Sequence, residues 1–218
     1  MSRTILIYGQ SGAGKTTSCR NLDPRSTCFI DCDGKGLSWQ GWRKQFNAAA
    51  KNYMQCNSPD MALRALRAID SNAPHIKIVI VDGISTLMQK EVFRRKAEKG
   101  YDKWTDLASY IFELVDHANH FRDDLTIVFI GHVDIERDKD GTLIFARLKT
   151  SGQMLRRIEL ESLFTTVLYA KTDDDEHHYF ETIPSKSTAK SPIGALEPVI
   201  ENDINIVIKQ LDAYEGVE

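Results

Sequence analysis

The chain has 218 residues, of which 42% are hydrophobic and 27% charged, and its formal net charge is −3. This length suits one α/β domain with a full core, and the composition is ordinary for a soluble globular protein. The charge balance excludes a protein that is basic all over and coats nucleic acid, so contact with DNA or RNA needs a local basic patch. No apolar run approaches the roughly 18 residues that a membrane span needs, and we expect no membrane partner.

The first predicted strand leads into a phosphate-binding loop. Residues 4–8 form an apolar run, and residues 9–16 (GQSGAGKT) match G-x-x-x-x-G-K-[ST] at every fixed position. Residues 17–22 can continue as a helix, which completes the strand–loop–helix context that the motif requires. Glycines let consecutive N–H groups turn around phosphate, Lys15 reaches the outer phosphates, and the Thr16 hydroxyl can ligate Mg²⁺.

We therefore predict that the chain binds ATP together with Mg²⁺. The predicted nucleotide-binding residues are Gly9, Gln10, Ser11, Gly12, Ala13, Gly14, Lys15, Thr16 and Thr17.

Two later strands are predicted to end in acidic residues. Residues 27–31 form a strand that delivers Asp31 and Asp33 to its C-terminal end, where ligands sit in an open α/β sheet. Their even spacing puts both carboxylates on the same side if the strand continues that far. Residues 76–82 are a β-branched run ending in Asp82, the Walker B arrangement, which predicts Thr16 and Asp82 as the metal-side groups. Gly83 follows, so the adjacent glutamate that many ATPases use as a base is missing.

The rest of the chain alternates helices and strands. Residues 84–99 predict a helix with a basic far end, residues 104–121 an amphipathic helix, and residues 125–130 a buried strand that carries Gly131 and His132. Residues 134–140 read as a charged turn, and Ser151 as the cap of a short helix. Antiparallel strands at 164–170 and 178–183 and a final helix at 203–214 complete the pattern. His177 and His178 are expected at a solvated hairpin tip.

The four cysteines do not form a metal-ligand pattern. We expect buried free thiols and, together with the nucleotide loop, a reducing cytoplasmic compartment, which is the host cytoplasm if a phage encodes the protein. The chain shows no repeat, low-complexity tract or linker, so one domain over residues 1–218 is the simplest organisation.

The order of these motifs resembles the core of RecA-type recombinases. It runs from the phosphate loop through residues 29–33 (FIDCD) and 79–82 (VIVD) to residues 128–132 (VFIGH). The later Lys186…Lys190 segment and the helix after Asn202 resemble phage nucleotide-binding proteins related to that core, some of which are single-strand annealing proteins. The resemblance covers nearly the whole chain. It implies a RecA-like α/β P-loop fold, a mostly parallel central sheet flanked by helices, with an antiparallel extension toward the C-terminus.

The resemblance also implies catalytic roles, besides those of Lys15 and Asp82. Asp33, or alternatively Asp31, would orient and deprotonate the water that attacks the γ-phosphate, although recombinases usually carry a longer Glu there. His132 would be the polar sensor of the γ-phosphate, a position that is usually Gln. Lys186 and Lys190 would reach the nucleotide of a neighbouring subunit, where positive charge stabilises the transition state.

Two DNA-contacting loops of that family would follow the Walker B strand and His132. The implied nucleic-acid-binding residues are Arg94, Arg95, Lys96, Lys99, Arg147 and Lys149, with Tyr101 and Trp104 near the first group for base stacking.

The leading hypothesis is thus an ATPase that acts on single-stranded DNA in phage-type recombination or annealing. It would work as a homo-oligomer, a ring or a filament, with a single-strand-binding protein as a further partner. A small-molecule or nucleotide kinase is one alternative, because kinases use the same loop. A non-hydrolysing nucleotide-dependent adaptor is the other.

Overall fold

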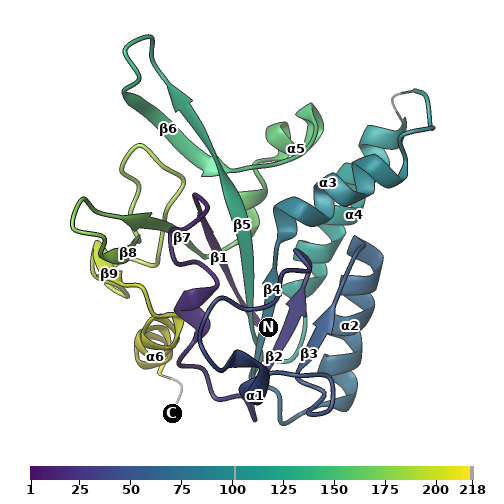
Figure 1. Ribbon diagram of the computed structural model, residues 1–218, viewed down its shortest axis with the longest axis vertical. Coiled ribbons are helices and arrows are strands. Elements are labelled where there is room, and N and C mark those ends of the chain that lie inside the picture. Colours follow the sequence, from purple (N-terminus) through teal and green to yellow (C-terminus); the bar gives the residue numbers. More distant parts are fainter. Residues whose placement is uncertain (101, 217–218) are drawn as a thin grey trace.

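The computed structural model describes residues 1–100 and 102–216, and within them one twisted sheet of nine strands organises the molecule (Figure 1). The order is β3-β2-β4-β5-β1-β7-β8-β9, and β6 pairs with β5 off this path. The strands are β1 (Arg3–Gly9), β2 (Thr27–Asp31), β3 (Tyr53–Gln55), β4 (Ile78–Asp82), β5 (Thr126–Arg137), β6 (Leu143–Leu148), β7 (Thr166–Thr172), β8 (His178–Glu181) and β9 (Val199–Glu201).

The six strands from β3 to β7 along this order pair in parallel, whereas β8, β9 and β6 pair antiparallel. A mostly parallel sheet with an antiparallel C-terminal extension confirms the predicted fold class. One domain over residues 1–218 stays a prediction.

Helices cover both faces of the sheet because its buried strands are apolar on both sides. Leu6 and Tyr8 of β1 face α2 (Pro59–Asn72), α3 (Ile84–Arg94) and α4 (Asp102–Ala118), whereas Ile5 and Ile7 face α6 (Ile204–Glu215). The shorter helices are α1 (Trp42–Gln45) and α5 (Gln153–Ile158), with 3₁₀ turns η1 (Thr17–Cys19) and η2 (Leu160–Leu163). None of the helices in the described part of the chain is both long and apolar enough to cross a membrane.

Strand β5 is longer than the sequence predicted. We expected a charged turn at residues 134–140, but the strand continues to Arg137 and forms a hairpin with β6 that projects beyond the sheet (Figure 1). The prediction failed because pairing with β6 offsets the charge: Asp134 lies opposite Arg147, and the two side chains approach to 3.7 Å. The actual turn is held by Asp138, whose carboxylate accepts from two backbone N–H groups of residues 140 and 142.

Three predicted helices also differ from the structure at one end. After the phosphate loop only η1 forms, because Ser, Thr and Asn compete with helix hydrogen bonds and Pro24 follows closely. Helix α3 ends at Arg94 rather than residue 99, because Arg95 turns away to bind Glu98 and Asp106. Helix α5 has Gly152, not Ser151, at its N-cap position.

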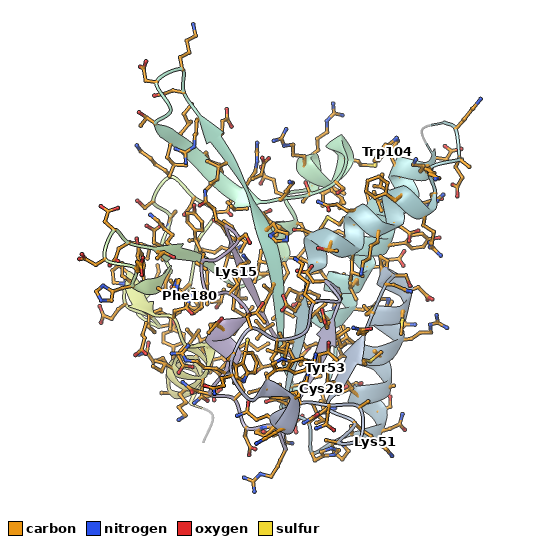
Figure 2. The ribbon with its side chains drawn as sticks, viewed as in Figure 1. Lys15, Cys28, Lys51, Tyr53, Trp104 and Phe180 are labelled. Atoms are coloured by element: carbon orange, nitrogen blue, oxygen red, sulfur yellow. The ribbon has the colours of Figure 1, made fainter. Side chains whose placement is uncertain are left out.

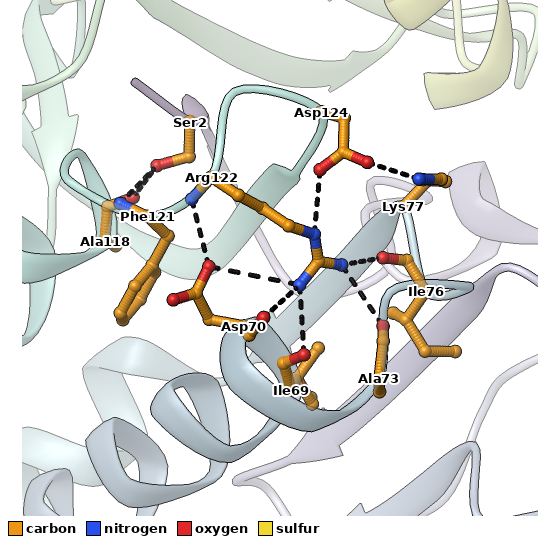
Figure 3. A network of polar contacts seen from close by, with 10 residues as sticks. All are labelled: Ser2, Ile69, Asp70, Ala73, Ile76, Lys77, Ala118, Phe121, Arg122 and Asp124. Atoms are coloured by element: carbon orange, nitrogen blue, oxygen red, sulfur yellow. Dashed lines mark hydrogen bonds and ion pairs between the residues drawn. The ribbon is translucent and has the colours of Figure 1, made fainter.

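A half-buried arginine, Arg122, lies at the end of the sheet opposite the carboxyl ends of the parallel strands (Figure 3). Arg122 donates to the carbonyls of Ile69 at 3.0 Å and Asp70 at 2.9 Å, and also to those of Ala73 and Ile76. These carbonyls end α2 or precede β4, and the last carbonyls of a helix have no partner within it. Arg122 therefore fixes α2 against the entries of β4 and β5.

Candidate nucleotide site

The predicted site residues meet because four parallel strands end at the same edge. Gly9 lies in register with His132, and Asp31 with Asp82. Strand β5 lies between β1 and β4, so the end of β5 faces the space between the phosphate loop and the Walker B carboxylate. A cavity of about 370 Å³ lies there, lined by the phosphate loop, Asp33, Asp82, His132 and other residues described below.

The phosphate loop has the turned backbone that the motif predicts. Gly12 and Gly14 have φ angles of +87° and +78°, which disfavour any residue with a Cβ atom. Gly9 is required for another reason, because a Cβ there would lie 2.5 Å from the carbonyl oxygen of Ala170 on β7. The loop thus packs tightly against β7 on one side and opens toward the cavity on the other.

Lys15 lies folded against its own loop near the carboxyl end of β1 (Figure 2). Its ammonium group donates to the carbonyl of Gly9 at 3.0 Å and of Gln10 at 2.6 Å. Burial lowers the pKa of Lys15, and the negative charges of Asp82 and Asp33 oppose that effect. The arrangement holds a cation beside the loop amides, where an anionic phosphate is a stronger acceptor than a neutral carbonyl.

Thr16 and Asp82 form the candidate magnesium site. The Thr16 hydroxyl donates to the Asp82 carboxylate at 2.7 Å. Burial raises the pKa of Asp82 to about 6, against the effect of the Thr16 hydrogen bond, and Asp33 and Asp31 add to the rise. The Asp82 carboxylate is buried without enough positive charge to balance it, and a hydroxyl lies next to it. This pair fits Mg²⁺, which binds few protein groups and completes its coordination shell with phosphate oxygens and water. The described residues contain no cluster of three His, Cys, Asp or Glu that would suit a metal held by protein alone.

The spacing of Asp31 and Asp33 suggested that both lie on the same side of a continuing strand. They do not, because β2 ends at Asp31. Asp31 is buried and accepts from the N–H groups of Gly34 and Gly36 and from the Tyr53 hydroxyl. It therefore holds the loop together. Asp33 lines the cavity instead.

Asp33 is bound through both carboxylate oxygens. Thr86, in the first turn of α3, donates to Oδ1, and Lys35 lies 3.1 Å from Oδ2. Burial raises the pKa of Asp33, but the hydrogen bonds from Thr86 and Lys35 outweigh it, and the net pKa is lowered. Asp33 is thus an ionised carboxylate beside the cavity.

His132 occupies the gap between the phosphate loop and Asp82. Its backbone N–H group donates to the Ser85 hydroxyl at 3.0 Å, and the Ser85 hydroxyl donates to the backbone carbonyl of Lys149 at 2.8 Å. Burial lowers the pKa of His132, and the charge of Lys15 lowers it further, so the imidazole is neutral at pH 7. A neutral imidazole can donate one hydrogen bond to phosphate without carrying charge.

The family of the chain follows from this arrangement and from comparison with known proteins. Residues 1–193 match the AAA_24 family model, described as an AAA domain. The chain belongs to this family. A search of curated proteins gave no match. The chain is thus a P-loop ATPase domain of the AAA type, and its phosphate loop lines the cavity at the carboxyl edge of the sheet.

Two further residues that no sequence motif indicated flank the phosphate loop of the AAA domain. His177 and His178 are exposed at the hairpin of β7 and β8, as expected, but His178 also lines the cavity. Asn202, just after β9, is buried, and a Cβ on Gly14 would lie 2.8 Å from its Oδ1. The Asn202 side-chain nitrogen is buried and has no hydrogen-bond partner among the described residues. No local pattern reveals either residue, because pairing of β7, β8 and β9 brings them to the loop.

Lys186 and Lys190 do not line the cavity of their own chain. Lys186 is exposed, and Lys190 borders a separate groove of about 400 Å³ beside β6, α5 and residues 184–190. Burial lowers the pKa of Lys190, and the charge of Glu161 opposes this. Any contact of these lysines with a nucleotide therefore needs a second copy of the AAA domain.

The predicted DNA-binding cations lie at two separate places. Arg94 is paired with the buried Glu91 at 2.6 Å, and Arg95 with Glu98 and Asp106, so these pairs neutralise much of their charge. Lys96 and Lys99 are exposed near the end of α3.

Of the predicted stacking residues, Tyr101 lies outside the described residues. Trp104 is half-buried at the outer end of α4 (Figure 2) and packs near Gly152. Arg147 and Lys149 lie on and just after β6, next to His132, whose carbonyl accepts from the Lys149 N–H group at 2.7 Å.

Proposed function

We propose that the protein is a Mg²⁺-dependent ATPase whose turnover is stimulated by single-stranded DNA, and that it acts as a RecA-like homo-oligomer in phage-type recombination or annealing. The observation that carries the proposal is the Ser85 hydroxyl, which joins the γ-phosphate edge of the cavity to the basic end of β6. It accepts from the backbone N–H group of His132 and donates to the backbone carbonyl of Lys149. Events at the nucleotide and at a strand bound beside β6 are therefore adjacent.

The proposed hydrolysis uses the amides of the phosphate loop and five side chains. The loop amides and Lys15 bind the phosphates and stabilise charge that develops on them. Thr16 and Asp82 would hold Mg²⁺, which when bound neutralises charge on the phosphate oxygens. Asp33 accepts a proton from water as the water oxygen bonds to the γ-phosphorus and the bond to ADP breaks. His132 donates a hydrogen bond that reports the presence of the γ-phosphate.

The groove beside β6 is the better candidate for single-stranded DNA. Its walls include the apolar Phe145, Leu148 and Leu155, and Arg147 supplies positive charge. Apolar and aromatic walls favour unstacked bases, and cations favour the backbone. The ion pairs of Arg147 are loose, at 3.7 and 3.8 Å. Lys96 and Lys99 are proposed as a second, weaker contact.

Assembly is part of the proposal because Lys186 and Lys190 lie away from their own cavity. In a ring or filament, these lysines of one copy would face the nucleotide of the next and add charge stabilisation there. DNA held in the neighbouring groove would favour that contact, so turnover, DNA binding and assembly would rise together. A single-strand-binding protein remains an expected partner.

The test is ATP turnover with and without a single-stranded oligonucleotide, alongside the mass of the assembly. We expect stimulation that weakens steeply as salt rises from about 50 to about 200 mM, because phosphate contacts release counterions. Lys149→Ala should reduce the slope of log affinity against log salt by about 1, and Lys209→Ala on α6 should not change it. If DNA alters neither turnover nor mass, the DNA role is wrong. ATP use only with a small acceptor would identify a kinase instead.

A further inference from the structure

Lys35 belongs to none of the sequence motifs, yet its side chain borders the nucleotide cavity. It lies in the loop of residues 31–36, between Gly34 and Gly36. The cavity that Lys35 lines is the same one that holds Lys15, Asp33 and His132. Lys35 and Lys15 are thus the two lysines among the described residues that line this cavity.

The backbone around Lys35 is held firmly, whereas its side chain is not. The Asp31 carboxylate accepts from Gly34 N–H at 2.7 Å and from Gly36 N–H at 3.0 Å. Gly36 also packs on Trp42, since a Cβ there would lie 2.7 Å from the indole ring. The Lys35 side chain itself is 72% exposed. A lysine with a fixed backbone and an exposed side chain can exchange one partner of its ammonium group for another.

Its present partner is the carboxylate that we propose as the base. Lys35 Nζ lies 3.1 Å from Asp33 Oδ2, while Thr86 donates to Oδ1. Burial raises the pKa of Asp33, and the hydrogen bonds from Thr86 and Lys35 lower it. Each carboxylate oxygen can accept a further hydrogen bond from water, but Asp33 is a weaker base while both donors remain. Loss of one donor would make Asp33 a stronger base. Thr86 lies within α3, whereas the Lys35 side chain is largely exposed.

We propose that Lys35 exchanges Asp33 for the γ-phosphate of bound ATP, so that triphosphate binding frees the oxygen of Asp33 that activates water. The γ-phosphate carries more negative charge than one carboxylate and offers three acceptor oxygens, so it competes well for an ammonium group. Lys35 thereby acts as a phosphate-binding residue of the same subunit and distinguishes ATP from ADP. The exchange rests on the proposed role of Asp33, but the binding of Lys35 to the γ-phosphate does not.

The experiment compares dissociation constants for a non-hydrolysable ATP analogue and for ADP, without DNA. For Lys35→Ala we expect affinity for the analogue to fall about tenfold, the loss of one charge-assisted hydrogen bond, and affinity for ADP to change less than about twofold. Lys35→Arg should keep most of the discrimination. Lys44→Ala, an exposed lysine of α1, is the matched control and should change neither constant.

Asp33→Asn provides the second arm, because it removes the charge that holds Lys35. The analogue should bind this variant as tightly as the parent or more tightly, and Lys35→Ala should weaken binding in this background too. Equal loss of analogue and ADP affinity, or no loss, overturns the proposal. The measurement needs neither hydrolysis nor DNA, so a protein that fails the DNA test above still gives a clear answer here.

Discussion

The Thr16 hydroxyl lies 2.7 Å from the Asp82 carboxylate, although 66 positions separate the two residues along the chain. The contact joins the phosphate loop to β4. This hydrogen bond does not offset the effect of burial on the carboxylate, because the pKa of Asp82 is still raised to about 6. At pH 7 the fold therefore holds an ionised Asp82 carboxylate at a cost in stability.

Asp82→Asn should stabilise the protein in the absence of nucleotide and magnesium while abolishing hydrolysis. The folded-state pKa lies about two units above the ordinary value near 4, so the folded state favours the protonated acid. The penalty is absent below about pH 4, grows between about pH 4 and 6, and reaches roughly 2–3 kcal/mol above pH 6. Denaturant unfolding with a chelator, at pH 8 and at pH 4, measures it. A variant less stable than the parent at pH 8 would contradict this account.

Asp33→Asn should impair turnover, whereas Asp31→Asn should impair stability. Asp33→Asn should lower turnover by about 10²-fold or more, because a general base is lost, while nucleotide affinity persists. Asp31→Asn removes the acceptor for Gly34, Gly36 and Tyr53 and should lower the free energy of unfolding by about 1–3 kcal/mol. Turnover, nucleotide binding and chemical denaturation of both variants separate the outcomes. Unchanged turnover in Asp33→Asn, with assembly still dependent on ATP, would favour the adaptor.

Gly14→Ala should cost more stability than Gly12→Ala. Both glycines have positive φ, so both alanines suffer similar backbone strain of about 1–2 kcal/mol. A Cβ on Gly12 meets nothing within 4 Å, whereas one on Gly14 meets Asn202 and His178. Thermal unfolding without nucleotide measures the difference, and Asn202→Ala should recover part of the Gly14→Ala loss. Equal losses in the two single variants would show that Asn202 does not press on the loop.

Ser85→Ala should reduce the DNA stimulation of turnover several-fold while leaving nucleotide affinity near that of the parent. The substitution removes the hydroxyl that joins His132 to Lys149 and leaves both backbone groups without that partner. Turnover with and without single-stranded DNA measures the effect, and Ser71→Ala, at an exposed position of α2, is the control. Full stimulation in Ser85→Ala would mean that the two sites communicate by another route.

Arg122→Ala should destabilise the protein without changing its affinity for nucleotide. The variant loses hydrogen bonds to four carbonyls and an ion pair with Asp124, which together suggest about 2–4 kcal/mol. Denaturant unfolding and nucleotide binding measure the two effects separately. Arg25→Ala, whose side chain is 89% exposed, should change stability by less than about 0.5 kcal/mol.

The sequence by itself determined the parts that depend on neighbouring residues. The glycines and Lys15 of the phosphate loop follow a local backbone geometry, and β-branched runs give the buried strands β1 and β4 whatever surrounds them. Ser58 likewise begins α2, where its hydroxyl accepts from Met61 N–H, as a local cap does. Because parallel strands end at one edge, the meeting of the loop with Asp82 and His132 also followed from the order of the motifs.

Only the tertiary structure decided what depends on partners far along the chain. It extended β5 through its charged residues by pairing them with β6, and it separated Asp31, bound to its own loop, from Asp33, which faces the cavity. It also brought His178 and Asn202 to the phosphate loop and engaged Asp33 with Thr86 and Lys35. A carboxylate or an amide has the same local pattern in each of these settings, and only the groups packed against it set its charge, its exposure and its role.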